Sequence, residues 1–372
     1  MKKIGITGQE GFIGKHLYNT LSLQKEAFEL VPFSKEYFGN NQQLDAFVSQ
    51  CDVIVHLAAM NRHESQEYIY ETNVNLVRSL IAAFERTQSK CHVLFSSSSQ
   101  EEKENRYGQS KKEGRQLLAH WAERNNAPLT GMIIPNVFGP FGKPFYNSVV
   151  ATFCHQVARN ESPQIHVDGN IKLIYVGELV EEIIKKIRTG IFEPDCVVPH
   201  TAEVNVSQIL ELLEGFKATY QENGTIPDLK NRFELDLFNT YRCYMDIQNH
   251  FPVHFTQHAD PRGTFVELIR LNTGGQVSFS TTVPGVTRGN HFHTRKIERF
   301  AVIKGNALIQ LRKIGTTEVL EFRVSGDQPG YVDMPVWYTH NIKNIGEDDL
   351  YTVFWINEFY NPEDPDTFFE NV

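Results

Sequence analysis

Residues 4–14 read IGITGQEGFIG, and this stretch decides the fold of the N-terminal half of the chain. A β-branched run leads into Gly8, Gly11 and Gly14, and an amphipathic helical pattern follows them. Glycine permits a tight turn and close approach of the backbone to a pyrophosphate, while the N-terminus of the next helix points at that anion. Since any tight strand–helix turn uses glycine, the flanking strand and helix carry the argument. Together they predict a dinucleotide-binding turn.

The pattern continues as short apolar runs alternating with helical segments, which is typical of repeated βαβ units and a parallel sheet. The predicted strands are residues 3–7, 28–33, 53–57, 92–96 and 129–134. We therefore expect an α/β architecture, a Rossmann-like doubly wound parallel sheet, in the first part of the chain.

The pattern changes towards the C-terminus. Helical segments dominate residues 149–220, and the polar, weakly periodic residues 221–251 are interpreted as a connection between domains. After His254, short strands alternate with glycine, proline and asparagine turns, which predicts an antiparallel barrel or jelly roll. The expected domains are residues 1–245, in which about 137–245 form the substrate-binding part and linker, and an all-β domain at 252–372.

Composition describes an ordinary globular protein with 41% hydrophobic and 22% charged residues. The formal net charge of −9 argues against nucleic-acid and membrane-surface binding. The five cysteines form no C-x-x-C pair, which favours reduced thiols in a cytosol. No signal-peptide pattern or long apolar span is present in the sequence, so we expect a cytoplasmic protein.

Tyr107 and Lys111 are spaced four residues apart in a predicted helix, so they share one face. A phenol with a pKa near 10 is a poor acid or base at neutral pH unless a cation favours its anion. Lys111 is the expected cation, and it also suits the ribose hydroxyls of a nucleotide. Upstream, a strand ends in the serines of residues 96–99, which offer a hydroxyl to a substrate carbonyl.

These motifs resemble the extended short-chain dehydrogenase/reductase family over roughly residues 1–245. The resemblance implies that Tyr107 is the catalytic acid, Lys111 its tuning cation and Ser98 the catalytic serine, with Ser97 as the alternative. It places Asn136 and Ser98 at the substrate. The other residues that it assigns to the cofactor, besides Tyr107 and Lys111, are Gly8, Gly11, Phe12, Ile13, Gly14, Leu57, Ala58, Ala59, Asn73 and Pro135.

Two features depart from that family. Only eight residues separate Ser98 from Tyr107, which is shorter than usual and leaves the choice of serine open. The acidic residue expected after the second strand is replaced by Ser34 and Lys35, with no acid before Glu36. A hydroxyl and a cation suit a 2′-phosphate, so NADPH is favoured over NADH. Residues 101–104, Glu-Glu-Lys-Glu, are interpreted as a solvated loop.

The second chemical pattern is G-x5-H-x-H-x4-E-x6-G at residues 285–305, followed by His340. On a barrel strand His291 and His293 point to the same side, because side chains alternate. Glu298 returns on the next strand, and His340 comes from a later one. Three imidazoles and a carboxylate suit a divalent metal such as Zn²⁺. The same residues would also fit a set of buried, hydrogen-bonded histidines.

These segments resemble the two motifs of the cupin superfamily, except that Trp337 stands where that family has glycine. Residues 260–267 and 285–291 are also similar to nucleotide-deoxysugar 3,5-epimerases. The whole chain resembles bifunctional capsular-polysaccharide enzymes that make precursors of N-acetyl-L-fucosamine. That resemblance implies a homodimer acting on a UDP-4-keto-6-deoxy-HexNAc. The cupin would epimerise C3 of UDP-2-acetamido-2,6-dideoxy-L-arabino-4-hexulose, and the reductase would reduce C4 with NADPH to UDP-2-acetamido-2,6-dideoxy-L-talose.

Three alternatives remain open at this point. The protein is a reductase whose cupin only supports dimerisation, or a non-enzymatic cofactor sensor, or a 4,6-dehydratase/epimerase that retains its nicotinamide. An intact Tyr107–Lys111 pair argues against the sensor, which needs neither residue. Whether a bound metal would be catalytic or structural, and which group is the epimerisation base, are not decided by the sequence.

Overall fold

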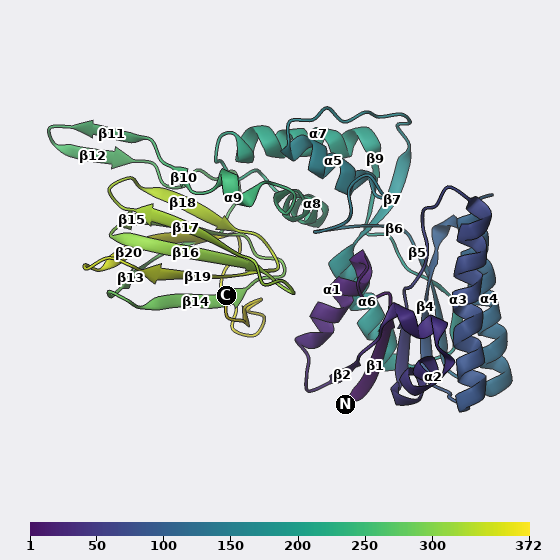
Figure 1. Ribbon diagram of the computed structural model, residues 1–372. Helices are drawn as coiled ribbons and strands as arrows, with labels where there is room; N and C mark the ends of the chain where they lie inside the picture. Colours follow the sequence, from purple (N-terminus) through teal and green to yellow (C-terminus); the bar gives the residue numbers. More distant parts are fainter. The chain divides into compact units, whose positions relative to one another are not determined.

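The computed structural model describes residues 1–372, and the chain forms two compact units (Figure 1). Residues 1–152 and 168–206 make the first unit, and residues 153–167 and 207–372 make the second. The division falls within helix α5, Val149–Ala158. None of the helices combines the length and apolar character that crossing a membrane requires.

The first unit contains the predicted parallel sheet, with the strand order β2-β1-β3-β4-β5-β8. The order reverses direction at β1, and the carboxyl ends of β1 and β3 meet where such folds bind ligands. The strands of this sheet are β1 Lys2–Thr7, β2 Phe28–Val31, β3 Val53–His56, β4 His92–Ser98, β5 Leu129–Ile134 and β8 Glu193–Val197.

Helices cover both faces of this sheet because its strands alternate between two apolar clusters. In β3, Ile54 packs with residues of α2, α3 and α4, whereas Val53 and Val55 pack with residues of α1 and α6. The helical segments are α1 Phe12–Ser22, η1 Lys35–Gly39, α2 Asn41–Gln50, α3 Gln66–Thr87, η2 Ser99–Glu102, α4 Arg106–Asn125 and α6 Val176–Thr189.

The predicted strand at 129–134 is confirmed, and the other four differ from the observed strands by one or two residues at an end. The expectation that helices dominate residues 149–220 is wrong in part, because three strands interrupt them. They are β7 Asn170–Tyr175, β8 and β9 Ala202–Asn205. β7 pairs with β9 and with β6 Asn136–Phe138 in a small second sheet.

The second unit contains two five-stranded antiparallel sheets, ordered β10-β18-β15-β20-β13 and β17-β16-β19-β14-β21, as the turn-rich pattern predicted. A separate hairpin joins β11 Gln257–Asp260 to β12 Gly263–Val266. The sheet strands are β10 Val253–His254, β13 Gln276–Thr282, β14 Thr287–Phe292, β15 Glu298–Lys304, β16 Asn306–Lys313, β17 Val319–Ser325, β18 Gly330–Met334, β19 Tyr338–Asn344, β20 Leu350–Ile356 and β21 Phe368–Phe369.

Residues 221–251 are not a simple connection, which corrects the interpretation from sequence. They contain α8 Arg232–Arg242 and α9 Ile247–His250, and they follow α7 Val206–Phe216 and the π-helix η3 Lys217–Gln221. Ile247 and Phe251 belong to the same apolar cluster as the strands of the sheets. The compact units therefore do not coincide with the predicted domain bounds of 1–245 and 252–372.

A buried polar network joins these helices to the sheets of the second unit. Arg299 on β15 and Asp333 on β18 form an ion pair with N–O distances of 2.7 and 2.9 Å. The Tyr220 hydroxyl of η3 donates to Asp333 at 2.8 Å, and Arg242 of α8 donates to the Met334 carbonyl at 2.9 Å. Removing one member of such a pair would leave a buried charge without its partner, so the network holds the helices in place.

Candidate functional site

The glycine turn after β1 has the geometry that its sequence predicted. Gly8 has a φ of +78°, and a Cβ there would lie 2.7 Å from the Ala58 nitrogen. A Cβ on Gly14 would lie 2.2 Å from the Gly8 carbonyl oxygen. Gly11 is the N-cap of α1 with no side-chain cap, and no acidic residue stands in the first turn, where Phe12 and Ile13 lie. This helix terminus therefore offers free N–H groups to an anion.

The end of β3 lies beside this turn through contacts with Thr7. The Leu57 nitrogen donates to the Thr7 carbonyl at 3.1 Å. The backbone of Ala58, which Ala59 follows, packs against Gly8. The Thr7 hydroxyl lies 2.6 Å from His56 Nδ1. Burial lowers the pKa of His56 to about 3, so its imidazole is neutral and serves as a hydrogen-bond partner. Hydrogen bonds thus hold the carboxyl ends of β1 and β3 next to each other.

Asn73 on α3 connects the loop that follows β3 to helix α4, which carries Tyr107. Its amide oxygen accepts from the Met60 nitrogen at 2.7 Å, and its amide nitrogen donates to the Met60 carbonyl at 3.0 Å and to the Ser110 hydroxyl at 3.1 Å. Ser110 in turn donates to the Tyr107 carbonyl at 2.7 Å. The predicted cofactor residue Asn73 therefore positions the loop and α4, because its polar atoms are already engaged.

Ser34 and Lys35 follow β2, at the place where the sequence put them. Gln9 of the glycine turn donates to the Phe33 carbonyl at 3.0 Å, which ties the two segments together. The Ser34 hydroxyl donates to the Glu36 carboxylate, and this bond lowers the pKa of Glu36. A carboxylate thus stands next to Ser34 at the end of β2.

Tyr107 and Lys111 lie side by side near the N-terminus of α4, as expected from their spacing. The Lys111 ammonium is 5.8 Å from the centre of the Tyr107 ring and donates to the Ser96 carbonyl at 2.8 Å. Burial lowers the pKa of Lys111 to about 8.

The expectation that Lys111 lowers the pKa of Tyr107 is wrong in direction. Burial, with a smaller contribution from Tyr146, raises the pKa of the Tyr107 phenol to about 12. The ammonium hydrogen bond of Lys111 is directed at a backbone carbonyl instead of the phenol. Tyr107 therefore keeps its proton at neutral pH, which suits a proton donor.

The serine-rich end of β4 leads into η2, and its two candidate serines differ in their contacts. The buried Ser97 hydroxyl donates to the Glu101 carboxylate. The Ser98 oxygen accepts from the Gln100 nitrogen at 3.2 Å, which leaves its hydroxyl hydrogen available for a carbonyl oxygen. The geometry therefore supports Ser98 as the serine that contacts substrate.

Glu101 does not lie in a solvated loop, which corrects the prediction for that residue, whereas residues 102–104 are exposed as predicted. Its carboxylate accepts from Arg115 Nε at 2.8 Å and from Nη2 at 2.7 Å, and the two side chains are 6% and 10% exposed. The short connection to Tyr107 requires Gly108, because a Cβ there would lie 2.0 Å from the Gln100 carbonyl oxygen. An ion pair and one glycine thus accommodate the unusual serine–tyrosine spacing.

The predicted substrate residue Asn136 opens the β6 strand directly after Pro135 and the end of β5. Its side chain is exposed and donates to the Lys172 carbonyl at 3.2 Å. Both residues stand at the carboxyl edge of the parallel sheet, the edge at which β1, β3 and β4 also end.

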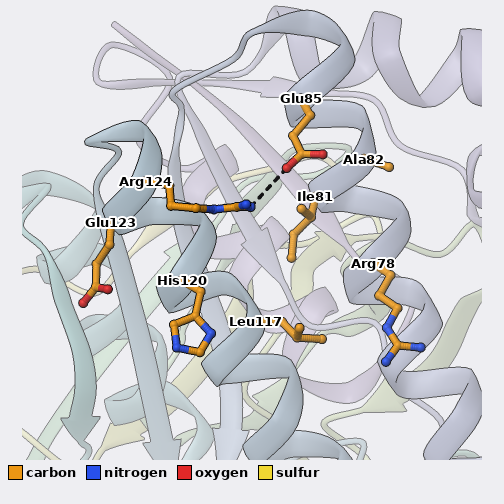
Figure 2. Close-up of a pocket in the computed structure, with 8 residues that line it drawn as sticks. All are labelled: Arg78, Ile81, Ala82, Glu85, Leu117, His120, Glu123 and Arg124. Atoms are coloured by element: carbon orange, nitrogen blue, oxygen red, sulfur yellow. Dashed lines mark hydrogen bonds and ion pairs between the residues drawn. The ribbon is translucent and has the colours of Figure 1, made fainter.

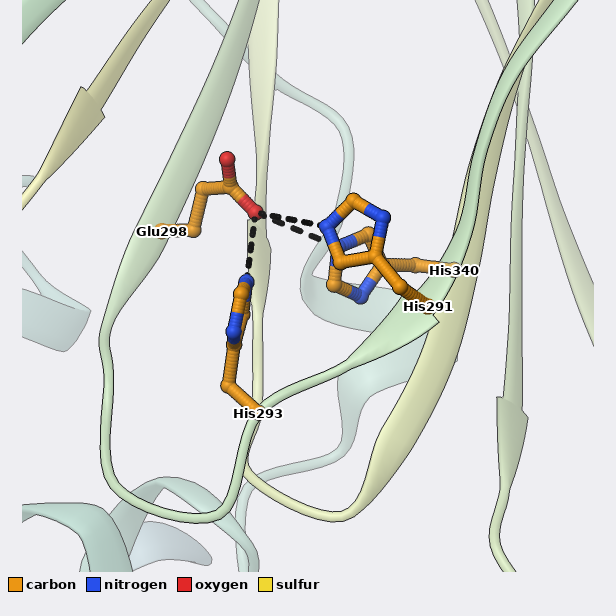
Figure 3. Close-up of side chains that lie close together, drawn as sticks. All are labelled: His291, His293, Glu298 and His340. Carbon is orange, nitrogen blue, oxygen red and sulfur yellow. Dashed lines mark hydrogen bonds and ion pairs between the residues drawn. The ribbon is translucent and has the colours of Figure 1, made fainter. Parts of the chain in front are cut away.

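In the second unit, four side chains converge: His291 on β14, His293 directly after that strand, Glu298 on β15 and His340 on β19 (Figure 3). Glu298 Oε2 lies 3.1 Å from His293 Nε2, 3.1 Å from His340 Nε2 and 3.9 Å from His291 Nε2. Ligands about 2.1 Å from a tetrahedral zinc would stand about 3.4 Å apart. The four donor atoms, all within 4.8 Å of one another, fit such an ion.

The ring nitrogens that face away from the cluster are also engaged. His293 Nδ1 is 2.5 Å from the Asp366 carbonyl oxygen, and His340 Nδ1 is 3.1 Å from that of Tyr338. Such contacts hold the proton on Nδ1 and leave Nε2 free for a metal. Burial alone would raise the pKa of Glu298, but the facing imidazoles hold it well below its ordinary value, so its carboxylate is ionised.

Trp337, which stands where the cupin pattern has glycine, keeps the backbone conformation of a glycine. Its φ is +63°, the left-handed conformation that glycine adopts most easily. The Trp337 nitrogen donates to the His293 carbonyl at 2.8 Å, and the buried indole packs on Phe292 with ring centres 5.6 Å apart. These contacts hold a strained backbone beside a predicted metal ligand.

Asp366 is a functional candidate that the sequence did not identify. Its buried carboxylate accepts from the backbone nitrogens of Thr294, Arg295 and Lys296, each at 3.0 Å, and from the Thr294 hydroxyl at 2.6 Å. It therefore organises the loop between His293 and Glu298. It lies 73 residues from His293 in the sequence, so no local pattern links the two residues.

Replacing Asp366 with asparagine is expected to lower metal affinity by about 10–100-fold, the usual cost of losing a group that orients a ligand. An amide cannot accept from all the donors that now face the carboxylate. The measurement is zinc binding by competition with a chromophoric chelator. Asp364→Asn is the matched control, since Asp364 is exposed in the same segment. Equal affinities in the two variants would contradict the role of Asp366.

A cavity of about 190 Å³ adjoins the histidine cluster and is lined by Ser280, Arg288, Gly289, His291, Glu298, Phe300, Ile342, Thr352 and Phe354. A larger open hollow of about 490 Å³ lies over α3 and α4, where Arg124 and Glu85 pair at 3.2 Å (Figure 2). None of the predicted site residues lines that larger hollow.

Two family models match separate parts of the chain. Residues 4–191 match the model of the NAD dependent epimerase/dehydratase family, and residues 258–368 match the polysaccharide biosynthesis C-terminal domain. A Pseudomonas aeruginosa protein named UDP-2-acetamido-2,6-beta-L-arabino-hexul-4-ose reductase is 34% identical over 368 residues, 98% of each chain.

Of two further relatives, one covers the whole chain and the other covers a part of it. The crystal structure of the capsular polysaccharide assembling protein CapF from Staphylococcus aureus covers 100% of both chains, with 36% identity and a TM-score of 0.63. The spore coat polysaccharide biosynthesis protein SpsL of Bacillus subtilis is 30% identical over 122 residues, 30% of this chain and 80% of that protein. The resemblance inferred from sequence is confirmed at the level of family and fold.

Proposed function

The chain belongs to the NAD dependent epimerase/dehydratase family, and from this premise we propose that it is a bifunctional nucleotide-sugar enzyme of capsular or O-antigen polysaccharide synthesis. Its substrate is UDP-2-acetamido-2,6-dideoxy-L-arabino-4-hexulose. The second unit epimerises C3, and the first reduces the C4 ketone to give UDP-2-acetamido-2,6-dideoxy-L-talose. One observation carries the proposal, namely that a Tyr–Lys pair at a nucleotide-binding sheet edge and a His₃Glu cluster occur in one chain.

In the reductase half, a bound reduced nicotinamide supplies the hydride for C4. Ser98 donates a hydrogen bond to the ketone oxygen, and Tyr107 transfers its proton to that oxygen as negative charge develops there. The raised pKa of Tyr107 supports this direction of transfer. Lys111, held by the Ser96 carbonyl, places its positive charge beside the phenol and stabilises the phenolate that remains.

In the epimerase half, the C3 proton is acidic because it lies next to the C4 ketone. His291, His293, Glu298 and His340 would hold a Zn²⁺, which as a Lewis acid stabilises negative charge on an enolate oxygen. The adjoining cavity holds the sugar, and its apolar wall of Phe300, Ile342 and Phe354 excludes water from the reacting carbon. Proton removal on one face and return on the other inverts C3.

The proposal is tested by incubating the purified protein with the 4-keto sugar nucleotide in heavy water. Without NADPH, deuterium should enter at C3. With NADPH, the product identified by NMR should be the C4 alcohol with inverted C3. Reduction without any C3 exchange would instead favour a reductase whose barrel is a structural dimerisation module.

We propose NADPH as the preferred cofactor, supported by Ser34 and Lys35 after β2. Glu36 is the group that opposes it, because its carboxylate would repel a 2′-phosphate. Lys35→Ala should therefore lower kcat/KM for NADPH about tenfold or more, the value of a hydrogen bond to a charged group, and leave that for NADH unchanged. Steady-state rates with both cofactors provide the measurement.

Glu36→Gln provides the complementary variant for this test. It should raise kcat/KM for NADPH relative to NADH, because the repulsion is removed. A wild-type enzyme that prefers NADH would overturn the assignment of the cofactor.

A 4,6-dehydratase would need acidic side chains between the serine and tyrosine motifs, and Glu101 in that segment is already engaged by Arg115 and Ser97.

A homodimer is part of our proposal. β13 is a sheet edge whose outward side chains Val277 and Phe279 are 57% and 71% exposed, which suits contact with a second copy. Light scattering of the purified protein should give twice the chain mass of 42.7 kDa.

A further inference from the structure

The cavity beside the histidine cluster has layered walls, as the strand registers show. On β15, Glu298, Phe300 and Val302 are two residues apart and therefore lie on the same face of the strand. Val302 pairs with Thr352 of β20. Phe300 pairs with Phe354, so a ring layer separates the Glu298 level from the Thr352 level. Ser280 of β13 lies directly opposite Thr352. Two hydroxyl side chains therefore face each other across neighbouring strands on one wall.

These hydroxyls have no partners within the protein. Thr352 is 2% exposed, and its Oγ1 is buried without a hydrogen-bond partner. The Ser280 side chain also makes no hydrogen bond, although both residues line the cavity. A buried hydroxyl without a partner is unfavourable, and valine would have the same shape as threonine without that cost. A threonine at this position therefore indicates a polar partner that binds from the cavity.

We propose that Ser280 and Thr352 form a subsite for an uncharged hydrogen-bonding substituent of the sugar nucleotide, such as an acetamido group. This inference rests on the proposed epimerase function. Each hydroxyl can both donate and accept a hydrogen bond, which matches the N–H and C=O of an amide group. A rotation about χ1 exchanges the methyl and hydroxyl of Thr352, so the hydroxyl reaches the cavity without movement of the backbone.

The size of the cavity sets which part of the ligand it takes. Pockets for drug-sized ligands hold about 300–1,000 Å³. The 190 Å³ cavity therefore accommodates a sugar ring with its substituents, and the nucleotide remains outside. Residues on one strand face repeat about every 6.6 Å, so the hydroxyls stand roughly 13 Å along the strand from the Glu298 level. They contact a group that projects from the ring, as the acetamido group on C2 does, while the neighbouring C3 faces the histidine cluster.

The first test is threonine-methyl NMR of the full chain titrated with UDP-N-acetylglucosamine as a stable UDP-2-acetamido sugar. The Thr352 resonance is assigned by its loss in Thr352→Val. It should shift during the titration, whereas the Thr281 resonance, assigned by Thr281→Val, should not, because Thr281 is exposed on the opposite face of β13. A Thr352 resonance that stays in place while other threonine methyls shift would overturn the subsite.

The second test separates a ligand contact from a structural one. Thr352→Val should raise the unfolding midpoint, because an unpartnered hydroxyl is removed, and should lower the rate of C3 deuterium exchange roughly tenfold, because a substrate hydrogen bond is lost. Thr281→Val should leave the exchange rate unchanged. A fall in both midpoint and rate would make the hydroxyl structural, and an unchanged rate would remove it from substrate binding. If the wild-type protein exchanges no deuterium, the proposed function fails and the methyl titration alone decides the subsite.

Discussion

Replacing Tyr107 with phenylalanine is expected to lower the rate of C4 reduction by about 10²–10⁴, the usual contribution of a positioned general acid. Phenylalanine fills the same space on α4, so the nucleotide-binding turn should be unaffected. NADPH binding, measured by fluorescence titration, should match the wild type. C3 exchange should also persist, because the histidine cluster belongs to the other compact unit.

Tyr18→Phe is the matched control for this experiment. Tyr18 lies on α1 with 41% of its surface exposed and has no role at the site. It should retain the wild-type rate. Full reductase activity in Tyr107→Phe would show that another group protonates the C4 oxygen.

The pH dependence of reduction gives an independent check on this pair. Burial lowers the pKa of Lys111 to about 8, so its charge is lost as pH rises through that value. Tyr107, with its pKa raised to about 12, keeps its proton over the same range. Reduction should therefore slow above about pH 8 because the phenolate loses its neighbouring cation, not because the acid is missing. A rate constant that is flat from pH 7 to about pH 10 would contradict this role of Lys111.

Replacing His340 with alanine is expected to abolish C3 exchange and the bound metal, while reduction of the ketone continues. His340 is fully buried, and its Nε2 lies 3.1 Å from Glu298. Loss of a ligand should weaken zinc binding by at least the ~10²-fold seen when a mere orienting group is removed. Because metal binding at a folded site adds to stability, the barrel should also unfold at a lower temperature.

Elemental analysis, deuterium exchange and calorimetry measure these three effects. In the wild type, one zinc per chain is expected, with ligand distances of about 2.0–2.2 Å by X-ray absorption. His258→Ala is the control, since His258 is an exposed histidine in the hairpin of the same unit. Wild-type protein purified without chelators and free of stoichiometric transition metal would make the cluster a metal-free site, with His291 as a candidate base.

Local patterns were sufficient for much of the candidate site. The i,i+4 spacing of Tyr107 and Lys111, the glycines of residues 8–14 and the alternation of His291 and His293 each encode geometry over a few residues. The backbone itself imposes such geometry, because helices repeat every 3.6 residues and strands every two. These placements needed no knowledge of distant contacts.

Other features depend on groups that are distant in sequence, and no local pattern predicts them. Asp366 binds the loop after His293, from which it is separated by 73 positions in the sequence. Arg115 binds Glu101, 14 positions earlier, and shields it from solvent. Burial, with a smaller contribution from Tyr146, reverses the pKa shift expected for Tyr107.

The chain by itself thus determined the two folds, their order and the reactive side chains, because periodicity and glycine placement are local properties. Only the tertiary structure decided how those side chains are held and charged. It also decided that α8 and α9 pack with the barrel, through Ile247 and Phe251 in its apolar core and Arg242 in the buried polar network. Desolvation and ion pairing are set by the groups that surround an atom, and folding brings those groups together from the whole chain.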